Sequence, residues 1–154
     1  MAPSASGQPT QWQTMEIDFA GPSATELGGS FNPFLDRRLE VEFFAPDGST
    51  SYVVPGFYDG DGAGGGDGNV WRARFTPDTP GQWVWTASFR EGAQVAIDLS
   101  NTAGADAENQ ITSVTAPGLD LPGLVGAFEV TPAAIDAPGF RGTGRLEYAG
   151  GHYL

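Results

Sequence analysis

The sequence predicts an all-β protein, an antiparallel sandwich of about seven to nine short strands. The apolar residues recur with a period of two, which is the pattern of strands with one face in a core and one in water. Glycine and proline account for 23 and 12 of the 154 residues, and they favour turns between short strands. No long stretch has helical periodicity. A chain of this length fits one domain.

Four segments show the alternation most clearly. In the first, Met15, Ile17 and Phe19 share an apolar face, and polar residues point the other way. The other three segments span residues 39–43, 71–75 and 82–89. Further candidates for strands are residues 51–55, 94–99, 111–114, 126–131 and 144–149.

Aromatic residues dominate the apolar face of two of these strands. The set consists of Trp71, Phe75, Trp83 and Trp85. We expect these side chains to be buried between the sheets, because large aromatic rings contribute most to a core. By the same alternation, Arg72 and Arg74 should lie on the outward face of their strand and pair with neighbouring carboxylates.

Turn residues separate the strands. Pro46-Asp47-Gly48 predicts a compact hairpin turn, and residues 77–81 connect the next two strands. Residues 32–36 could hold a short turn of helix. Residues 100–125 are rich in Gly, Ala, Asp and Pro, and we expect a long loop there, with or without a short strand.

Composition excludes several classes of function. The 19 acidic and 7 basic residues give a net charge of -12, which repels phosphate backbones and anionic membranes, so we expect no nucleic-acid partner. The chain has no cysteine, which excludes disulfides, thiolate catalysis and Cys-based zinc sites. It has no apolar run of transmembrane length and no signal-peptide core, so we expect no membrane insertion.

The glycine-rich segment 59–69 is the most unusual part of the sequence. Its carboxylates are Asp59, Asp61 and Asp67. Carboxylate oxygens in a flexible loop suit calcium, which makes these three residues a candidate metal site. An EF-hand loop would carry ligands where this segment has Ala63 and Val70, and no flanking helices are evident. The alternative is an acidic hairpin loop without a metal.

Residues outside the expected core are candidates for binding a carbohydrate, because a flat aromatic ring can stack on the apolar face of a sugar. Trp12 breaks from the alternation of the strand that follows it and is the best candidate for an exposed aromatic, with Phe44 as a secondary one. Tyr58 and Asp59 could pair a stacking ring with a hydroxyl acceptor. The predicted carbohydrate site consists of Trp12, Phe57, Tyr58, Asp59, Arg72 and Arg74.

Catalytic motifs are missing from the sequence. Glycoside hydrolysis needs two positioned carboxylates, and no pair stands out in a chain this acidic. Nucleophile elbows, phosphate loops and zinc motifs are also absent. We therefore expect no enzymatic activity in this chain.

Several short runs occur in the order and spacing of a known family. The strongest are Gly-Phe-Tyr-Asp-Gly at 56–60, Arg-x-Arg-Phe-x-Pro at 72–77 and Gly-x-Trp-x-Trp-Thr at 81–86. Together with Trp12 and Asn-Pro-Phe at 32–34, they make residues 11–131 resemble an immunoglobulin-like domain of unknown function. That domain is found at the N-terminus of secreted proteins classed as glycoside hydrolases.

The resemblance implies an immunoglobulin-like sandwich that precedes a (β/α)₈ catalytic barrel. Residues 1–10 would then be a flexible leader, 11–131 the sandwich, and 132–154 a linker and strand leading toward a catalytic domain that the chain does not include. It also implies a secreted, non-catalytic accessory domain of a polysaccharide-degrading enzyme. The family supplies no established ligand-binding residues.

Two roles for such an accessory domain stay open. The domain could bind a polysaccharide or oligosaccharide, with or without calcium, or it could pack against the catalytic domain of the same polypeptide and support it. Exposed, coplanar aromatic rings would favour the first role. An apolar patch around Trp12 and the C-terminal strand would favour the second.

Overall fold

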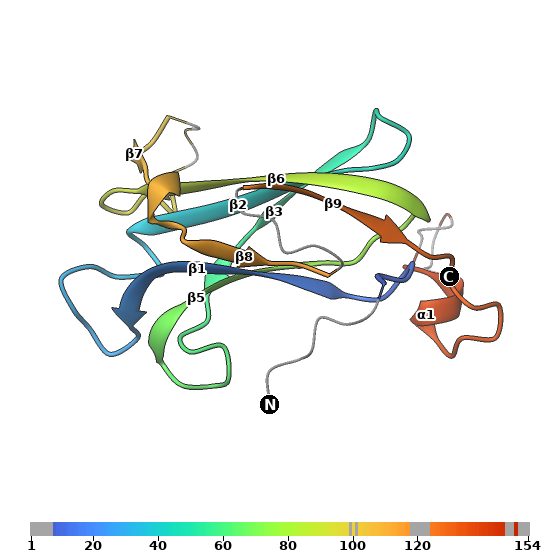
Figure 1. Ribbon diagram of the computed structural model, residues 1–154, viewed down its shortest axis with the longest axis horizontal. Coiled ribbons are helices and arrows are strands. Elements are labelled where there is room, and N and C mark those ends of the chain that lie inside the picture. The colour runs from blue at the N-terminus through green and yellow to red at the C-terminus, as the bar shows by residue number, and fades with distance from the viewer. Residues whose placement is uncertain (1–7, 99, 101, 118–123, 147–149, 151–154) are drawn as a thin grey trace.

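The computed structural model describes residues 8–98, 100, 102–117, 124–146 and 150. These residues form an all-β sandwich whose nine strands lie in two antiparallel sheets, as the sequence predicts (Figure 1). The first sheet has the order β4 (Phe57–Tyr58), β5 (Asp67–Phe75), β1 (Met15–Thr25) and β8 (Ser113–Thr115). The second has the order β3 (Ser51–Pro55), β2 (Arg37–Phe44), β6 (Gly81–Glu91) and β7 (Ala105–Asp106), and β9 (Val125–Val130) also pairs with β6.

The core lies between the two sheets, where the inward residues of each strand meet. Trp71, Trp83 and Trp85 are at most 1% exposed, and Phe75 is buried beside them, which confirms the predicted aromatic core. Its rings pack closely: Phe43 stacks on Phe75 with ring centroids 4.1 Å apart. Edge-to-face pairs such as Phe19 with Trp85 fill the remaining space.

The hairpin between β2 and β3 has the turn that the sequence predicts. The backbone N–H of Ala45 donates to the carbonyl of Thr50, which closes the turn. The Asp47 carboxylate accepts hydrogen bonds from the backbone N–H groups of Ser49 and Thr50. These bonds, together with one from the Thr50 hydroxyl, lower the pKa of Asp47 to about 2.

The prediction of a strand over residues 94–99 is wrong. Residues 94–97 form turns and residue 98 is irregular, and residue 99 lies outside the described residues. Gln94 has a positive φ of 57°, and the N–H of Val95 donates to the carbonyl of Gly92. Val95 is buried and Ile97 is exposed, so these two apolar residues do not share a face as they would in a strand.

Other predicted elements are shifted or shorter. The strand predicted over 111–114 is β8, and the expected loop over 100–125 also contains β7 and a short 3₁₀ helix, η1 (Glu108–Gln110). Residues 32–36 form a single hydrogen-bonded turn, in which the N–H groups of Leu35 and Asp36 donate to the carbonyl of Asn32. The strand predicted over 144–149 is absent from residues 144–146, and 147–149 lie outside the described residues.

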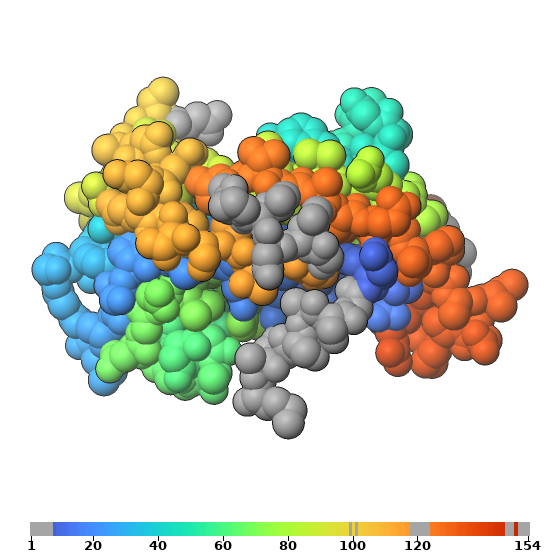
Figure 2. All heavy atoms as spheres, viewed as in Figure 1, coloured from blue at the N-terminus to red at the C-terminus, as the bar shows by residue number. Residues whose placement is uncertain are grey.

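The two ends of the described chain meet at one end of the sandwich. An isolated bridge joins Thr10 to Thr131, and the short helix α1 (Phe140–Thr143) follows β9. In the space-filling view, the first described residues (blue) lie beside the segment after β9 (orange) at this end (Figure 2). Among the described residues, no helix has the length and apolar character needed to span a membrane.

Candidate functional site

The outward face of the first sheet carries most of the predicted carbohydrate site. The antiparallel register places Asp18 opposite Arg72 and Glu16 opposite Arg74. Arg72 donates to both oxygens of Asp18, with Nε–Oδ1 and Nη2–Oδ2 distances of 2.6 and 3.0 Å, and its Nη1 pairs with Asp59. Arg74 donates from Nε to Glu16 at 2.8 Å. The predicted pairing of both arginines with neighbouring carboxylates is confirmed.

Arg72 was predicted to be a surface residue that could contact a ligand, but it is only 6% exposed. It projects away from the core, but the glycine-rich loop folds back over it: a Cβ added at Gly62 would lie 3.4 Å from Arg72 Nη2. The hydrogen bond to Asp18 and the nearby carboxylates raise the pKa of Arg72 above its usual value, despite its burial. This guanidinium is fully occupied within the protein and is not presented to a ligand.

The prediction of Tyr58 as a stacking ring is also wrong, because Tyr58 is 3% exposed. The pairing register of β1 with β5 shifts between Ala20 and Ala24, which forms a β-bulge. The Tyr58 hydroxyl hydrogen-bonds to the backbone beside this bulge. The hydroxyl donates to the Ala24 carbonyl at 2.5 Å and accepts from the Gly68 N–H at 3.0 Å. Burial raises the pKa of Tyr58, which keeps this donor protonated.

Phe57 and Arg74 remain at the surface as a pair. The Arg74 guanidinium lies 5.1 Å from the centre of the Phe57 ring, and Arg74 also binds Glu16. Arg74 is exposed and Phe57 is half-buried. The cation therefore occupies one face of the ring on which a sugar was expected to stack.

The three carboxylates of the predicted calcium site have separate roles. Asp59 pairs with Arg72, and Asp61 accepts two hydrogen bonds of 2.8 Å from backbone N–H groups of its own loop, which lower its pKa. Asp67 is exposed at the start of β5. Across the described residues, no group of three acidic or histidine side chains could hold a metal ion. The arrangement gives no support to calcium binding, which stays a prediction.

A groove beside the edge strand β3 contains Trp12, another residue of the predicted carbohydrate site. It lies between β3 and the end of β5 and has a volume of about 340 Å³. Its lining consists of Trp12, Tyr52, Val53, Val54, Phe75, Thr76 and Arg145. Trp12 has a positive φ of 65°, and its backbone N–H donates to the Pro77 carbonyl at 2.9 Å, so a tight turn fixes the ring.

Arg145 lies across the two outer rings of this groove. Its guanidinium carbon is 5.7 Å from the centre of the Trp12 ring and 6.0 Å from that of Tyr52. Its Nη2 donates to Asp78 Oδ2 at 2.6 Å, and the Tyr52 hydroxyl donates to the same oxygen at 2.6 Å. We call Trp12, Tyr52, Asp78 and Arg145 the Arg145 clamp. Trp12 is therefore a half-buried contact for the C-terminal segment rather than a free ring.

The outward face of the second sheet has a hollow of about 360 Å³ that the sequence-based site did not include. Its lining consists of Arg38, Glu40, Glu42, Val53, Thr86, Ala87, Ser88 and Arg90, and we call it the outer trough. The signal was available in the sequence, because Glu40, Glu42, Thr86 and Ser88 are the polar, outward residues of two predicted strands. They were not recognised because they are neither aromatic nor clustered in the sequence.

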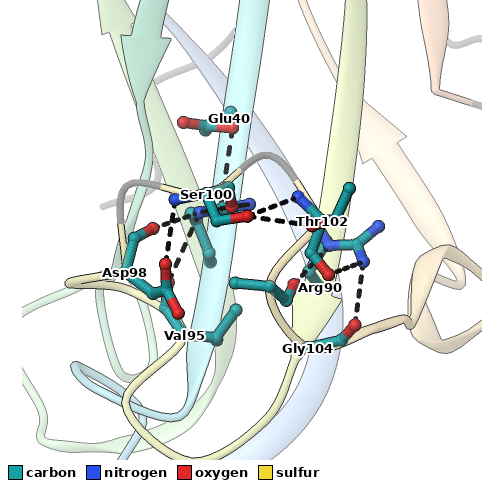
Figure 3. A network of polar contacts seen from close by, with 9 residues as sticks. Glu40, Arg90, Val95, Asp98, Ser100, Thr102 and Gly104 are labelled. Carbon is teal, nitrogen blue, oxygen red and sulfur yellow. Dashed lines mark hydrogen bonds and ion pairs between the residues drawn. The ribbon is translucent and has the colours of Figure 1, made fainter.

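Two arginines of the outer trough bind backbone carbonyls of the segment that follows β6. Arg38 Nη1 donates to the carbonyls of Asp98 and Ser100, at 2.7 and 3.3 Å. Arg90 donates to the carbonyls of Ala103 and Gly104, at 2.7 and 2.8 Å. Figure 3 shows Arg90, Ser100, Thr102 and Gly104 gathered in this network, with Glu40 beside them.

Comparison with known proteins gives one family and one solved structure. Residues 8–90 match the family described as Domain of unknown function (DUF5060). The chain is also similar to a putative glycoside hydrolase from Bacteroides vulgatus ATCC 8482, with 25% identity and a TM-score of 0.46. The match covers 82% of this chain but 16% of the other, so the chain spans a small part of that protein's length. No curated protein matches the chain.

Proposed function

Because this chain belongs to the family described as Domain of unknown function (DUF5060), whose description assigns no activity, we propose a function from its own geometry. The chain is a non-catalytic accessory domain of a secreted polysaccharide-degrading enzyme. Its role there is to support the catalytic domain of the same polypeptide, by holding the segment that leads to that domain in a fixed position.

The Arg145 clamp is the observation that carries this proposal. Four side chains from distant parts of the sequence meet there, and the three contacts of Arg145 restrain the segment after β9. Arg145 is bound by a charged hydrogen bond and lies over two aromatic rings, a combination for which the planar guanidinium is well suited. The buried Gly144 lies against the Trp12 ring, since a Cβ added there would be 2.8 Å from it. These contacts hold the described segment at Gly144 and Arg145 against the sandwich.

The predicted carbohydrate site gives less support to the alternative role. Tyr58 is inside the sandwich, Arg72 is enclosed by carboxylates, and one face of the Phe57 ring is covered by Arg74. Trp12 contacts Arg145 instead of offering a free face. These residues do not form the coplanar, exposed aromatic platform that stacking on a sugar chain requires.

Small-angle X-ray scattering of the complete polypeptide to which this domain belongs tests the support role. Asp78→Ala removes the acceptor of the clamp, and Asp136→Ala removes an exposed carboxylate after β9 as a matched control. We expect the first variant to have a larger maximum dimension and an earlier unfolding transition of the catalytic domain, and the control to match the wild type. Identical scattering and unfolding for all three proteins would contradict the proposal.

A second measurement addresses catalysis in the isolated chain. We expect no turnover of aryl glycosides or polysaccharides, because the clustered carboxylates are engaged by arginines or by backbone N–H groups. Turnover that a point mutation within this chain abolishes would show that the domain is an enzyme.

A further inference from the structure

We propose that the outer trough binds a neutral polysaccharide chain. This binding function is separate from the support role proposed above: the trough lies on the outward face of β2, β3 and β6 and includes none of the four clamp residues, although Val53 lines both the trough and the groove beside Trp12. The trough does not include Trp12, Phe57 or Tyr58, the aromatic residues of the site predicted from the sequence.

The trough presents a regular ladder of polar side chains. The register of β2 with β6 places Arg38 opposite Arg90, Glu40 opposite Ser88, and Glu42 opposite Thr86. All six are outward residues that line the hollow. Successive rungs are roughly 7 Å apart, because alternate residues of a strand share a face. The ladder therefore offers hydrogen-bonding groups at a repeating spacing along one line, which suits an extended polymer with repeated hydroxyls.

The charges of the trough favour a neutral ligand. Two arginines and two glutamates line it, so its formal charge is zero, although the whole protein carries -12. Carboxylates accept hydrogen bonds from hydroxyl groups, and the hydroxyls of Thr86 and Ser88 can both donate and accept. The acidic remainder of the protein repels an anionic chain, which argues against acidic glycans and nucleic acids.

The trough also has apolar contacts for the C–H groups of a sugar ring. Val53, opposite Glu42 on the neighbouring strand, is 60% exposed and lines the hollow. Phe44 and Val84 face each other across β2 and β6 at the next rung, and they are 38% and 41% exposed. The face therefore joins a polar ladder to an apolar end, the combination that a polyhydroxylated ring requires.

The polar groups are held in place before any ligand binds. Glu42 accepts a hydrogen bond of 2.8 Å from the Ser51 hydroxyl, and Glu40 lies 3.7 Å from Arg38 Nε. Arg38 and Arg90 are fixed by hydrogen bonds to the carbonyls of Asp98 and Ala103. Such preorganisation lowers the entropy cost of binding, so a shallow site can still be specific.

The test is an amide NMR titration of the isolated chain with soluble neutral polysaccharides: mixed-linkage β-glucan, arabinoxylan, galactomannan and pullulan. We expect at least one of them to shift the amides of β2, β3 and β6 that flank the trough. Polygalacturonate, an acidic polymer, should cause no shift. The proposal is overturned if no neutral polymer binds, if only polygalacturonate binds, or if the shifts gather around Trp12 instead.

Variants locate the site independently of the shifts. Ser88→Ile fills the trough from an outward position without adding an aromatic ring on which a sugar could stack, and it should weaken binding at least about tenfold, which is about 1.4 kcal/mol. Glu42→Gln keeps the shape but removes a charged acceptor, and it should also weaken binding measurably; Asp136→Asn is the control. Unchanged affinity in both trough variants would place the ligand elsewhere. Asp78→Ala should leave affinity unchanged, so a failure of the clamp and a failure of the trough are distinguishable.

Discussion

Arg145 donates a hydrogen bond of 2.6 Å to Asp78, although 67 positions separate the two residues in the sequence. The same carboxylate oxygen accepts the Tyr52 hydroxyl, and the guanidinium lies over the rings of Trp12 and Tyr52. The segment after β9 is thus tied to the loop after β5 and to the edge strand β3. This link between the end of the described chain and its sandwich is the basis of the proposed support role.

The clamp predicts an abnormal titration of Tyr52. The hydrogen bond to Asp78 and burial raise the pKa of Tyr52 above its ordinary value of 10.0. Because the folded pKa is raised, the stabilising effect is complete below pH 10 and is lost as the pH rises through the folded pKa. Ultraviolet titration of the phenols should show this group shifted back toward its ordinary value in Asp78→Ala. An unshifted wild-type Tyr52, or no change in the variant, would argue against the contact.

The two arginines of β5 should differ in their importance for folding. Arg72→Ala removes the buried cation that pairs with Asp18 and Asp59 under the glycine-rich loop. Because both carboxylates lose this partner, we expect the free energy of unfolding to fall by about 3 kcal/mol. Arg74→Ala removes an exposed ion pair and should cost less than about 1 kcal/mol. Chemical denaturation of both variants measures the difference. Equal effects would mean that the loop does not cover Arg72.

Tyr58→Phe tests the role of the Tyr58 hydroxyl at the β-bulge. The substitution keeps the ring but leaves the Ala24 carbonyl and the Gly68 N–H without this partner. We expect a loss of about 1–3 kcal/mol in the free energy of unfolding, because buried polar groups without partners are costly. Stability equal to that of the wild type would show that water reaches these groups.

Trp83→Ala tests the aromatic core. Trp83 is fully buried, and its indole N–H donates to the Thr79 carbonyl at 2.9 Å. We expect a loss of about 3–5 kcal/mol, as for other large-to-small changes in a core. The neighbouring Val84→Ala lies on the outward face and should change stability by about 0.5 kcal/mol or less. Thermal unfolding of the two variants should therefore differ strongly despite their adjacent positions.

The sequence predicted the sandwich because alternation is a local signal. The strands around Ile17, Val41, Ala73 and Trp85 each show it, and the structure buries the expected side of each. Alternation failed at 94–99, where a positive φ at Gln94 bends the chain out of any strand. A pattern of side chains carries no information on such a backbone angle.

The candidate sites depended on contacts that no local pattern reveals. Tyr58 was expected at the surface, but the bulge in β1 creates a buried position for its hydroxyl. Arg72 was expected in solvent, but the loop that was considered as a metal site folds over it. Trp12 was predicted to be exposed because it does not follow the alternation of the next strand. In the structure its ring contacts Arg145, which lies near the other end of the described chain. Long-range contacts of this kind become visible only in the folded chain.

The central claim is that Asp78 holds Arg145 and so fixes the described segment between β9 and Arg145. Limited trypsin digestion of the isolated chain tests it most directly, since trypsin must release Arg145 from the clamp to cleave after it. We expect cleavage after Arg145 to be slow in the wild type and in Asp136→Ala but severalfold faster in Asp78→Ala, since the half-exposed ion pair contributes up to about 1 kcal/mol to the protection of that bond. Equal cleavage rates in all three proteins would contradict the account.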